Sequence, residues 1–344
     1  ARQTPYVMLL LNVEYFEGEA DQYVLPLAHV TGDRAHTLLA ENRNAVVARS
    51  ASAAGDGVFV DALWEPGFSE RLLNAIAGRR SFSGTSSTLS TSRTRAFRAL
   101  RGDTSDHLEP RVLRAEQSNT SVVFGDRLIM KLFRRIEPGV NPDLEIGRFF
   151  TERTGLEHVP RVAGAIEYER PRAEPATLAI LQEFIPNEGD AWEYTQDELE
   201  RFIERVLTDP GTLPPSDSGR LLHLAKSETA ETAPGHIGGF VELARLLGQR
   251  SAEMHVALAS ATTDRAFAPE AYSPFQQRAL YQGLRSQATA ALRTLRSRLD
   301  AIPERARAEA RDILGRESEL LARFEPVARQ KLSSLAIRIH GDYH

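Results

Sequence analysis

The sequence predicts an α+β protein in which a β-rich part precedes a mostly helical part, and three observations carry this prediction. Short apolar runs separated by Gly, Asp and Asn fill residues 5–63, a pattern typical of antiparallel sheet. Strand-like runs resume near Pro110 and end at Pro186. Beyond Pro186 the chain is rich in Leu, Ala, Arg and Glu and has helical periodicity in four segments, residues 195–207, 237–262, 274–300 and 303–334.

Composition narrows the class of protein. The 344 residues suffice for two or three domains, and a net charge of −5 gives no field that would gather nucleic acid. The absence of cysteine excludes disulfides and thiolate metal sites, as is usual in a reducing compartment. The apolar run Val7–Leu11 is too short to span a bilayer. We therefore expect a cytoplasmic protein with neither nucleic-acid nor membrane partners.

Two internal segments lack the apolar residues that a packed core needs. Residues 79–95 are rich in Ser, Thr and Gly with interspersed Arg, and residues 208–235 are rich in Pro, Ser and Thr. Such segments cannot bury enough apolar surface to offset the entropy of ordering them. We predict that both are mobile loops. The arginines of the first could also attract phosphate.

The strands after Pro110 contain clear boundary signals. Gly125 and Asp126 lie between two apolar runs, which predicts a hairpin turn. Asn141 followed by Pro142 predicts the N-cap and first position of a helix that ends near Gly155. Two further strands are expected in residues 159–170 and 176–186.

Lys131 is the first candidate functional residue. Period-two alternation places it on one strand face with Ile129 and Phe133, while the opposite face is also apolar. A lysine in this setting needs an anion, and Glu145 in the next helix could supply one. Such a Lys–Glu pair positions ATP phosphates in kinases. The alternative is an edge-strand lysine whose amine reaches water.

Two segments flank Lys131 where a two-lobed kinase would bind its nucleotide. Residues 116–121 precede it by one hairpin and, although they lack glycine, could present backbone N–H groups to phosphate. Residues 181–186 would form the inter-lobe hinge. By composition alone, the first segment is also an ordinary turn and the second an ordinary buried strand.

The last residues, "AIRIHGDYH", predict a short strand at 336–339 followed by a His-Gly-Asp turn. Asp342 would accept the proton of an acceptor hydroxyl, and His340 would brace the loop. A purely structural turn is the alternative. Because Ala1 is not an initiator methionine and the chain stops on this turn, we expect the sequence to be a segment of a longer protein.

Several of these stretches match one family. The strings "AEQSNTSVVFGDRLIMKLFRRIEPGVNPDLEIGRFFTE", "ILQEFIPNEGDAW" and "IHGDYH" resemble bacterial maltokinases, particularly the form fused to trehalose synthase. The resemblance implies a two-lobed, protein-kinase-like fold of the aminoglycoside phosphotransferase type. It divides the chain into an N-terminal β-rich cap (1–107), a kinase N-lobe (108–184) and a mostly α C-lobe that is truncated at the catalytic loop (185–344).

The resemblance also implies an activity and a set of site residues. The activity is ATP-dependent phosphorylation of maltose at its anomeric hydroxyl, with Mg²⁺, to give maltose 1-phosphate for α-glucan synthesis. The expected partner is a trehalose synthase domain, in the same chain or in a partner chain. Asp342 would be the base, and the Mg²⁺ ligands are expected beyond His344. The nucleotide would be held by a phosphate loop, a positioning pair and a hinge, namely Ser118, Asn119, Thr120 and Ser121; Lys131 and Glu145; and Gln182, Glu183, Phe184 and Ile185.

Two other functions fit the same residues. One is a kinase for another small hydroxylated acceptor, because the resemblance places much of the acceptor site beyond the sequence. The other is a non-catalytic docking module of a synthase fusion. A substrate screen distinguishes the first from a maltokinase, and the continuation of the gene past His344 distinguishes the second.

Overall fold

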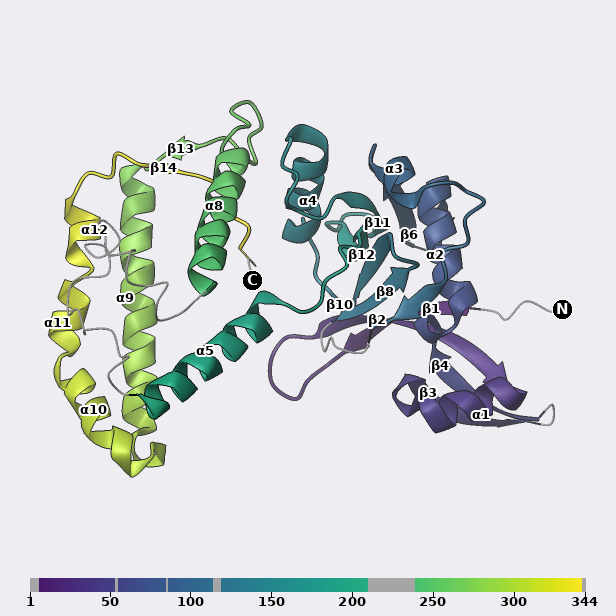
Figure 1. Cartoon of the computed structure of the whole chain (residues 1–344), viewed down its shortest axis with the longest axis horizontal. Helices are drawn as coiled ribbons and strands as arrows, with labels where there is room; N and C mark the ends of the chain where they lie inside the picture. Colours follow the sequence, from purple (N-terminus) through teal and green to yellow (C-terminus); the bar gives the residue numbers. More distant parts are fainter. Residues whose placement is uncertain (1–5, 53–54, 85, 114–118, 210–238, 342–344) are drawn as a thin grey trace. The chain divides into compact units, whose positions relative to one another are not determined.

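The computed structural model describes residues 6–52, 55–84, 86–113, 119–209 and 239–341 (Figure 1). The chain forms two compact units. The first comprises Ala1–Glu253 with His340–His344, and the second comprises Met254–Ile339. Every residue of the predicted nucleotide site belongs to the first unit.

A five-stranded antiparallel sheet opens the first unit, in the order β1-β2-β4-β3, with β10 also pairing to β2. The short apolar runs of the sequence form these strands, as predicted. Two α-helices and two 3₁₀ turns accompany them. The elements are β1 (Tyr6–Val13), β2 (Asp21–Thr31), α1 (Gly32–Glu41), η1 (Arg43–Ala45), β3 (Val46–Ser52), β4 (Gly55–Asp61), η2 (Ala62–Trp64), α2 (Pro66–Gly78) and β10 (Arg135–Ile136).

A seven-stranded antiparallel sheet follows, in the order β5-β6-β11-β12-β9-β8-β7. The predicted hairpin turn at Gly125 and Asp126 joins β8 to β9 and is confirmed. The strands are β5 (Ser81–Ser83), β6 (Thr88–Arg93), β7 (Pro110–Val112), β8 (Asn119–Phe124), β9 (Leu128–Phe133), β11 (Val162–Glu169) and β12 (Ala176–Glu183); α3 (Phe97–Arg101) precedes β7.

The two sheets share one hydrophobic core. Alternate residues of β9, Leu128, Met130 and Leu132, are fully buried in the same cluster as Val24 and Val58 of the first sheet. This follows from strand geometry, because successive side chains point to opposite faces. One face of the seven-stranded sheet therefore packs against the first sheet and α2, and Lys131 lies on the other face.

Helix α4 (Pro142–Arg153) packs near that second face. The Asn141 side chain accepts a hydrogen bond from the Leu144 N–H at 3.1 Å, and Pro142 occupies the first turn, so the predicted helix start is confirmed. Leu144 packs with Val162 in a small apolar cluster. Gly147 permits the close approach, since a Cβ there would lie 2.5 Å from a Val162 methyl group.

The prediction of a mobile loop at 79–95 is wrong for most of its length. Strand β6 lies inside the sheet and pairs with β11 along its whole length. Its hydroxyl groups are satisfied by hydrogen bonds: Thr91 donates to the carbonyls of Ala75 and Arg80 at 2.8 Å each, and Ser90 to the Glu169 carboxylate at 2.8 Å. A polar strand is stable here because these partners, distant in sequence, replace water. The second predicted loop, 208–235, lies almost entirely outside the described residues.

The helical prediction for the chain beyond Pro186 is confirmed. Helices α5 (Ala191–Thr208) and α8 (Phe240–Leu258) follow the sheet, and the remaining segments form four more. These are α9 (Pro274–Ser297), α10 (Glu304–Gly315), α11 (Glu317–Ala322) and α12 (Glu325–Arg329), with η5 (Leu299–Ala301) and the strand pair β13 (Glu270–Ala271) and β14 (Leu335–Ala336). No helix among the described residues has the length and apolarity needed to cross a membrane.

Two sequence-based expectations concern the molecule at a larger scale. Strands β5 and β6 fall within the predicted cap range 1–107 but pair into the seven-stranded sheet, while the division at residue 107 stays a prediction.

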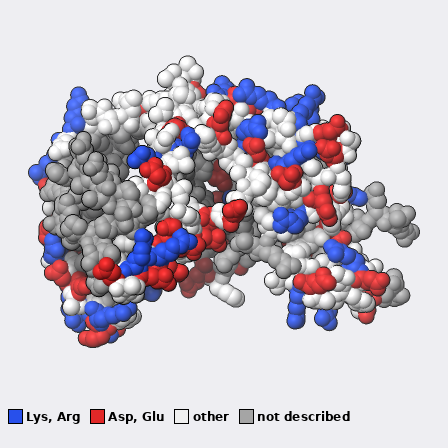
Figure 2. All heavy atoms as spheres, viewed as in Figure 1, with Lys and Arg blue, Asp and Glu red and all other residues white. Residues whose placement is uncertain are grey.

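The surface carries charges of both signs. Figure 2 shows acidic and basic side chains intermixed on the viewed face of a protein whose net charge is −5.

Candidate nucleotide site

Lys131 lies on the face of the seven-stranded sheet against which α4 packs. Along β9 the residues alternate between fully and partly buried, and Lys131 shares the partly buried face with Ile129 and Phe133, as predicted. Its neighbours across the sheet are Ser121 of β8 and Ile180 of β12. With 29 % of its side chain exposed, the ammonium group is partly desolvated but reachable. It lies 5.3 Å from the centroid of the Phe133 ring.

The carboxylate that pairs with Lys131 is Asp143, and the Nζ–Oδ2 distance is 3.4 Å. Asp143 lies in the first turn of α4, where the N-terminal end of the helix dipole favours a negative charge. The predicted partner, Glu145, is two residues further along the helix and so points about 200° away around its axis. The structure thus gives Lys131 a different acidic partner from the predicted one. Glu145 is half-buried and has interactions of its own.

Asp143 is the site residue that sequence reasoning missed. Two acidic residues occupy the first turn of α4, and either could reach the neighbouring strand. Choosing between them requires the rotation of the helix about its axis. That rotation is set by the burial of Leu144, Ile146, Phe149 and Phe150. The apolar residues of the helix were therefore the available signal.

The predicted phosphate loop is in part a strand. Asn119, Thr120 and Ser121 belong to β8 and pair with Phe133, Leu132 and Lys131 of β9, respectively. Asn119 and Ser121 share the Lys131 face by strand alternation. The predicted loop residue Ser118 lies outside the described residues. Asn119, Thr120 and Ser121 were predicted to form part of a phosphate-binding turn. The structure corrects this prediction, because all three lie in a strand.

Thr120 faces the other way and has a structural role. Its hydroxyl accepts hydrogen bonds from the Arg134 guanidinium at 2.9 and 2.7 Å. The same guanidinium forms an ion pair with Asp61 at the end of β4. The side chain of Thr120 is thereby committed to the junction between the two sheets. The predicted role of Thr120 in the phosphate loop relies on its backbone and stays a prediction.

The predicted hinge begins as the end of β12. Gln182 and Glu183 are still in the strand, where they pair with Ile129 and Leu128 of β9. The Glu183 N–H donates to the Arg161 carbonyl, and the Phe184 N–H to the Arg127 carbonyl, both at 2.9 Å. These two N–H groups therefore already have acceptors.

Ile185 offers the next backbone donor. Its N–H donates to no backbone oxygen of the described residues, and its side chain is 51 % exposed. Pro186 has no N–H, so Ile185 is the last possible donor before the helical part. Within the predicted hinge, Gln182, Glu183 and the Phe184 N–H support the sheet. Among the described residues, the Ile185 N–H is the hinge donor without a backbone acceptor.

A bidentate ion pair fixes the strand end just before this donor. The Arg161 guanidinium donates to both carboxylate oxygens of Glu183 at 2.9 Å each. These hydrogen bonds lower the pKa of Glu183 and raise that of Arg161. The pair joins the end of β12 to the residue before β11, so it holds the entrance of the hinge in register.

The predicted catalytic turn is described only in part. Strand β14 is shorter than predicted and ends at Ala336, and residues 337–340 are irregular. His340 is half-buried and has interaction partners. Asp342 lies outside the described residues, so its role as base, and that of His340 as brace, stay predictions. Among the residues that the structure does describe, no three His, Asp or Glu side chains gather as a metal site.

Comparison with known proteins supports the fold class. No family model matches the chain. A solved glucosamine kinase structure has 16 % identity and a TM-score of 0.51 over 99 % of this chain and 62 % of its own. Another, a glucosamine kinase with glucosamine, ADP and inorganic phosphate, has 19 % identity and a TM-score of 0.47 over 99 % and 63 %. The chain thus spans under two thirds of these kinases and has the α+β, kinase-like fold that the sequence predicts.

Proposed function

We propose that the protein is an ATP-dependent sugar kinase whose acceptor is maltose, phosphorylated at the anomeric hydroxyl to give maltose 1-phosphate. The observation that carries the kinase assignment is Lys131, half-buried on the face of the sheet that faces α4 and paired with Asp143. The Ile185 N–H, which has no backbone acceptor in the described part of the chain, and the kinase-like fold support it. The choice of maltose rests on the resemblance of residues 115–152, 180–192 and 339–344 to maltokinases.

In this proposal, the residues of the sheet bind and orient the nucleotide. The Lys131 ammonium group donates to phosphate oxygens, and Asp143 keeps it extended along the face of the strand. The backbone N–H of Ile185 donates to the base. Because Lys131 and the hinge lie on adjacent antiparallel strands, β9 and β12, one rigid sheet sets the spacing between base and phosphates.

The transfer step needs a base at the acceptor. The acceptor oxygen forms a bond to the γ-phosphorus as the bond from that phosphorus to the leaving oxygen of ADP breaks, and the hydroxyl proton passes to the Asp342 carboxylate. Mg²⁺ would neutralise charge on the phosphate oxygens. Among the described residues no three His, Asp or Glu side chains gather to hold it, and the resemblance places its ligands beyond His344.

The supply of maltose is part of the same proposal. The resemblance is strongest to maltokinases joined to trehalose synthase, so we propose such a domain, in the same or a partner chain, as the partner. Such a domain would supply the maltose that is the acceptor here. Copurification of maltose-forming activity with the natural protein would support this part of the proposal.

The test is sugar-dependent release of ADP by the natural protein, with maltose, glucose, glucosamine or no sugar as acceptor. We expect turnover with maltose that requires Mg²⁺. Asp342→Asn should lower kcat by a factor on the order of 10² or more, because the acceptor then lacks its base. Asp312→Asn, which alters an exposed carboxylate in α10, is the matched control and should leave kcat unchanged.

The outcomes separate the levels of the proposal. Turnover with glucosamine and not maltose would leave a sugar kinase but overturn the acceptor. Full activity of Asp342→Asn would overturn the role of that residue. ATP binding without transfer to any sugar would favour the docking-module alternative.

A further inference from the structure

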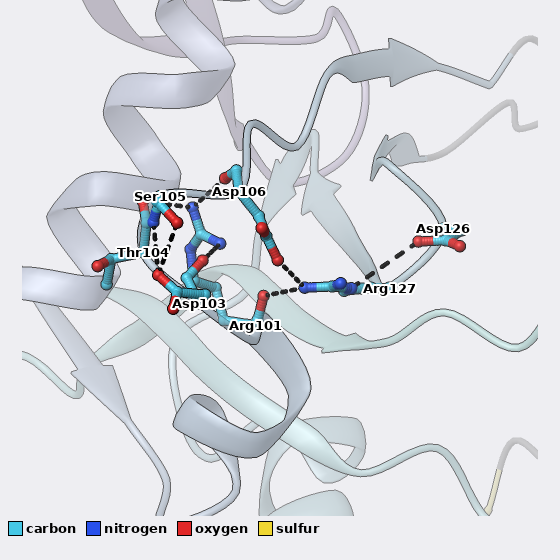
Figure 3. A network of polar contacts seen from close by, with 7 residues as sticks. All are labelled: Arg101, Asp103, Thr104, Ser105, Asp106, Asp126 and Arg127. Carbon is cyan, nitrogen blue, oxygen red and sulfur yellow. Dashed lines mark hydrogen bonds and ion pairs between the residues drawn. The ribbon is translucent and has the colours of Figure 1, made fainter.

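The loop that follows α3 is closed by its own side chains. The Arg101 guanidinium donates to the carbonyl of Asp106 at 2.7 Å and also to those of Asp103 and Thr104 (Figure 3). The Asp103 carboxylate accepts hydrogen bonds from the N–H and hydroxyl of Ser105 at 2.9 and 2.8 Å, which lowers its pKa. Residues 101–106 therefore form a compact unit, which we call the 101–106 loop.

This loop holds the side chain of Arg127. One guanidinium nitrogen of Arg127 donates to the Arg101 carbonyl at 3.1 Å and to the Asp106 carboxylate at 2.8 Å (Figure 3). Gly102 makes room for it: its φ is +75°, and a Cβ there would overlap the guanidinium. Arg127 immediately precedes β9, the strand that carries Lys131.

The backbone of the same residue contacts the hinge. The Arg127 carbonyl accepts the hydrogen bond of the Phe184 N–H at 2.9 Å. Its own N–H donates to the Phe124 carbonyl at 3.3 Å and closes the turn between β8 and β9. A single residue thus joins the 101–106 loop, through its side chain, to the residue before the Ile185 donor, through its carbonyl.

We infer that Arg127, held by Asp106, is a positioning residue for nucleotide binding: it fixes the backbone of Phe184 and thereby aims the N–H of Ile185 at the base. The inference rests on the proposed function, because it assigns the hinge to a nucleotide. Arg127 acts through Phe184 and does not touch the nucleotide. The hydrogen bond from the Ile185 N–H to the base is the same in the ground state and the transition state. Its loss therefore weakens nucleotide binding and leaves kcat unchanged.

The size of the effect follows from one weakened hydrogen bond. Such a bond contributes about 0.5–1.5 kcal/mol, so Asp106→Ala should raise the Kd for ATP by a factor of about 2 to 13. The KM for ATP should rise by a similar factor. The KM for the sugar and kcat should not change. A purely structural role for Asp106 would instead lower all activities together with the melting temperature.

The experiment is an isothermal titration of ATP into the natural protein and its variants, with ADP release measured in parallel. Asp106→Asn keeps an oxygen acceptor for Arg127 and should restore most of the affinity lost in Asp106→Ala. Asp126→Ala is the matched control, because Asp126 is 87 % exposed and only 4.0 Å from the same guanidinium. It should bind ATP like the unaltered protein. Gly102→Ala, which displaces Arg127 directly, should weaken ATP binding independently of Asp106.

Each outcome decides the inference. Equal ATP affinity of Asp106→Ala and the unaltered protein would overturn it while leaving the kinase proposal in place. Weaker ATP binding by Asp106→Ala, in a protein that turns over no sugar, would support the inference and overturn the proposed sugar-kinase activity. If the unaltered protein does not bind ATP, both proposals are wrong. If Asp126→Ala weakens binding as much as Asp106→Ala, the effect is general electrostatics and the inference is wrong.

Discussion

The seven-stranded sheet and the helices beyond Pro186 differ in how fully they bury their own apolar side chains. In the sheet, Leu128, Met130, Leu132, Leu178 and Leu181 are completely buried. In the described helices beyond Pro186, the buried residues are Met254, Leu258, Leu292 and Ala310, and α5 has none. Lys131 and the hinge thus lie in a part of the chain whose backbone geometry is fixed by many buried contacts. Local changes should have large and specific effects there and small effects in the helices.

The largest difference is expected in stability. Leu132→Ala removes a fully buried side chain and leaves a cavity, which should lower the free energy of unfolding by about 2–5 kcal/mol. Leu247→Ala in α8 alters a side chain that is 56 % exposed and should change it by less than about 0.5 kcal/mol. Urea denaturation of the two variants measures both. Similar losses would show that the helices are as tightly packed as the sheet.

The next difference is expected in activity. Lys131→Met keeps the apolar stem and removes the charge, so kcat/KM for ATP should fall by a factor on the order of 10²–10³. Lys331→Met, at an exposed position of the helical part, is the matched control and should keep full activity. Steady-state kinetics with ATP varied measure both. A Lys131→Met protein that keeps its activity would mean that Lys131 merely extends toward water, the alternative left open by the sequence.

The smallest difference concerns pH. Arg161 lowers the pKa of Glu183 in the sheet, while Arg316 and Arg323 lower that of Glu319 in α11 to about 2. Both folded pKa values lie below the unfolded value of about 4.3. Each carboxylate therefore stabilises the fold above that pH, and the contribution is lost as pH falls through the folded pKa.

The two carboxylates should nevertheless differ in their effect on global stability. Glu183 joins two strand ends, whereas Glu319 pairs with neighbours three and four residues away on an exposed surface. Glu183→Gln should therefore lower the melting temperature near neutral pH more than Glu319→Gln. The deficit of Glu183→Gln should shrink as the pH is lowered below about 4. Equal melting temperatures of the two variants across this range would contradict the distinction.

The parts of the fold set by local pattern could be predicted from sequence. The alternation of Leu128–Phe133 gives the face of Lys131, and Asn141 with Pro142 gives the start of α4. The failures involve partners that are distant in sequence. Strand β6 was missed because its hydroxyl groups depend on the carbonyls of Ala75 and Arg80 and on the Glu169 carboxylate of β11.

The candidate site was predictable to the same extent. The position of Lys131 followed from one strand, but its partner depended on the rotation of α4, which gives Asp143 instead of Glu145. The side-chain partner of Thr120 could not be predicted either, because Arg134 also binds Asp61, 73 residues away from it in sequence. Contacts of this kind depend on how the two sheets meet.

The shared core of the two sheets also bears on how proteins of this architecture can diverge. The first sheet covers the face formed by Leu128, Met130 and Leu132, so it behaves as half of a single folding unit and not as an attachment. An exchanged N-terminal segment would have to reproduce the shape of Val24, Val58 and their neighbours, or leave that face in water. Substitutions on the two sides of this interface are therefore constrained to compensate each other. Substitutions on the opposite face, which carries Lys131, are limited instead by the chemistry of the role proposed for that residue.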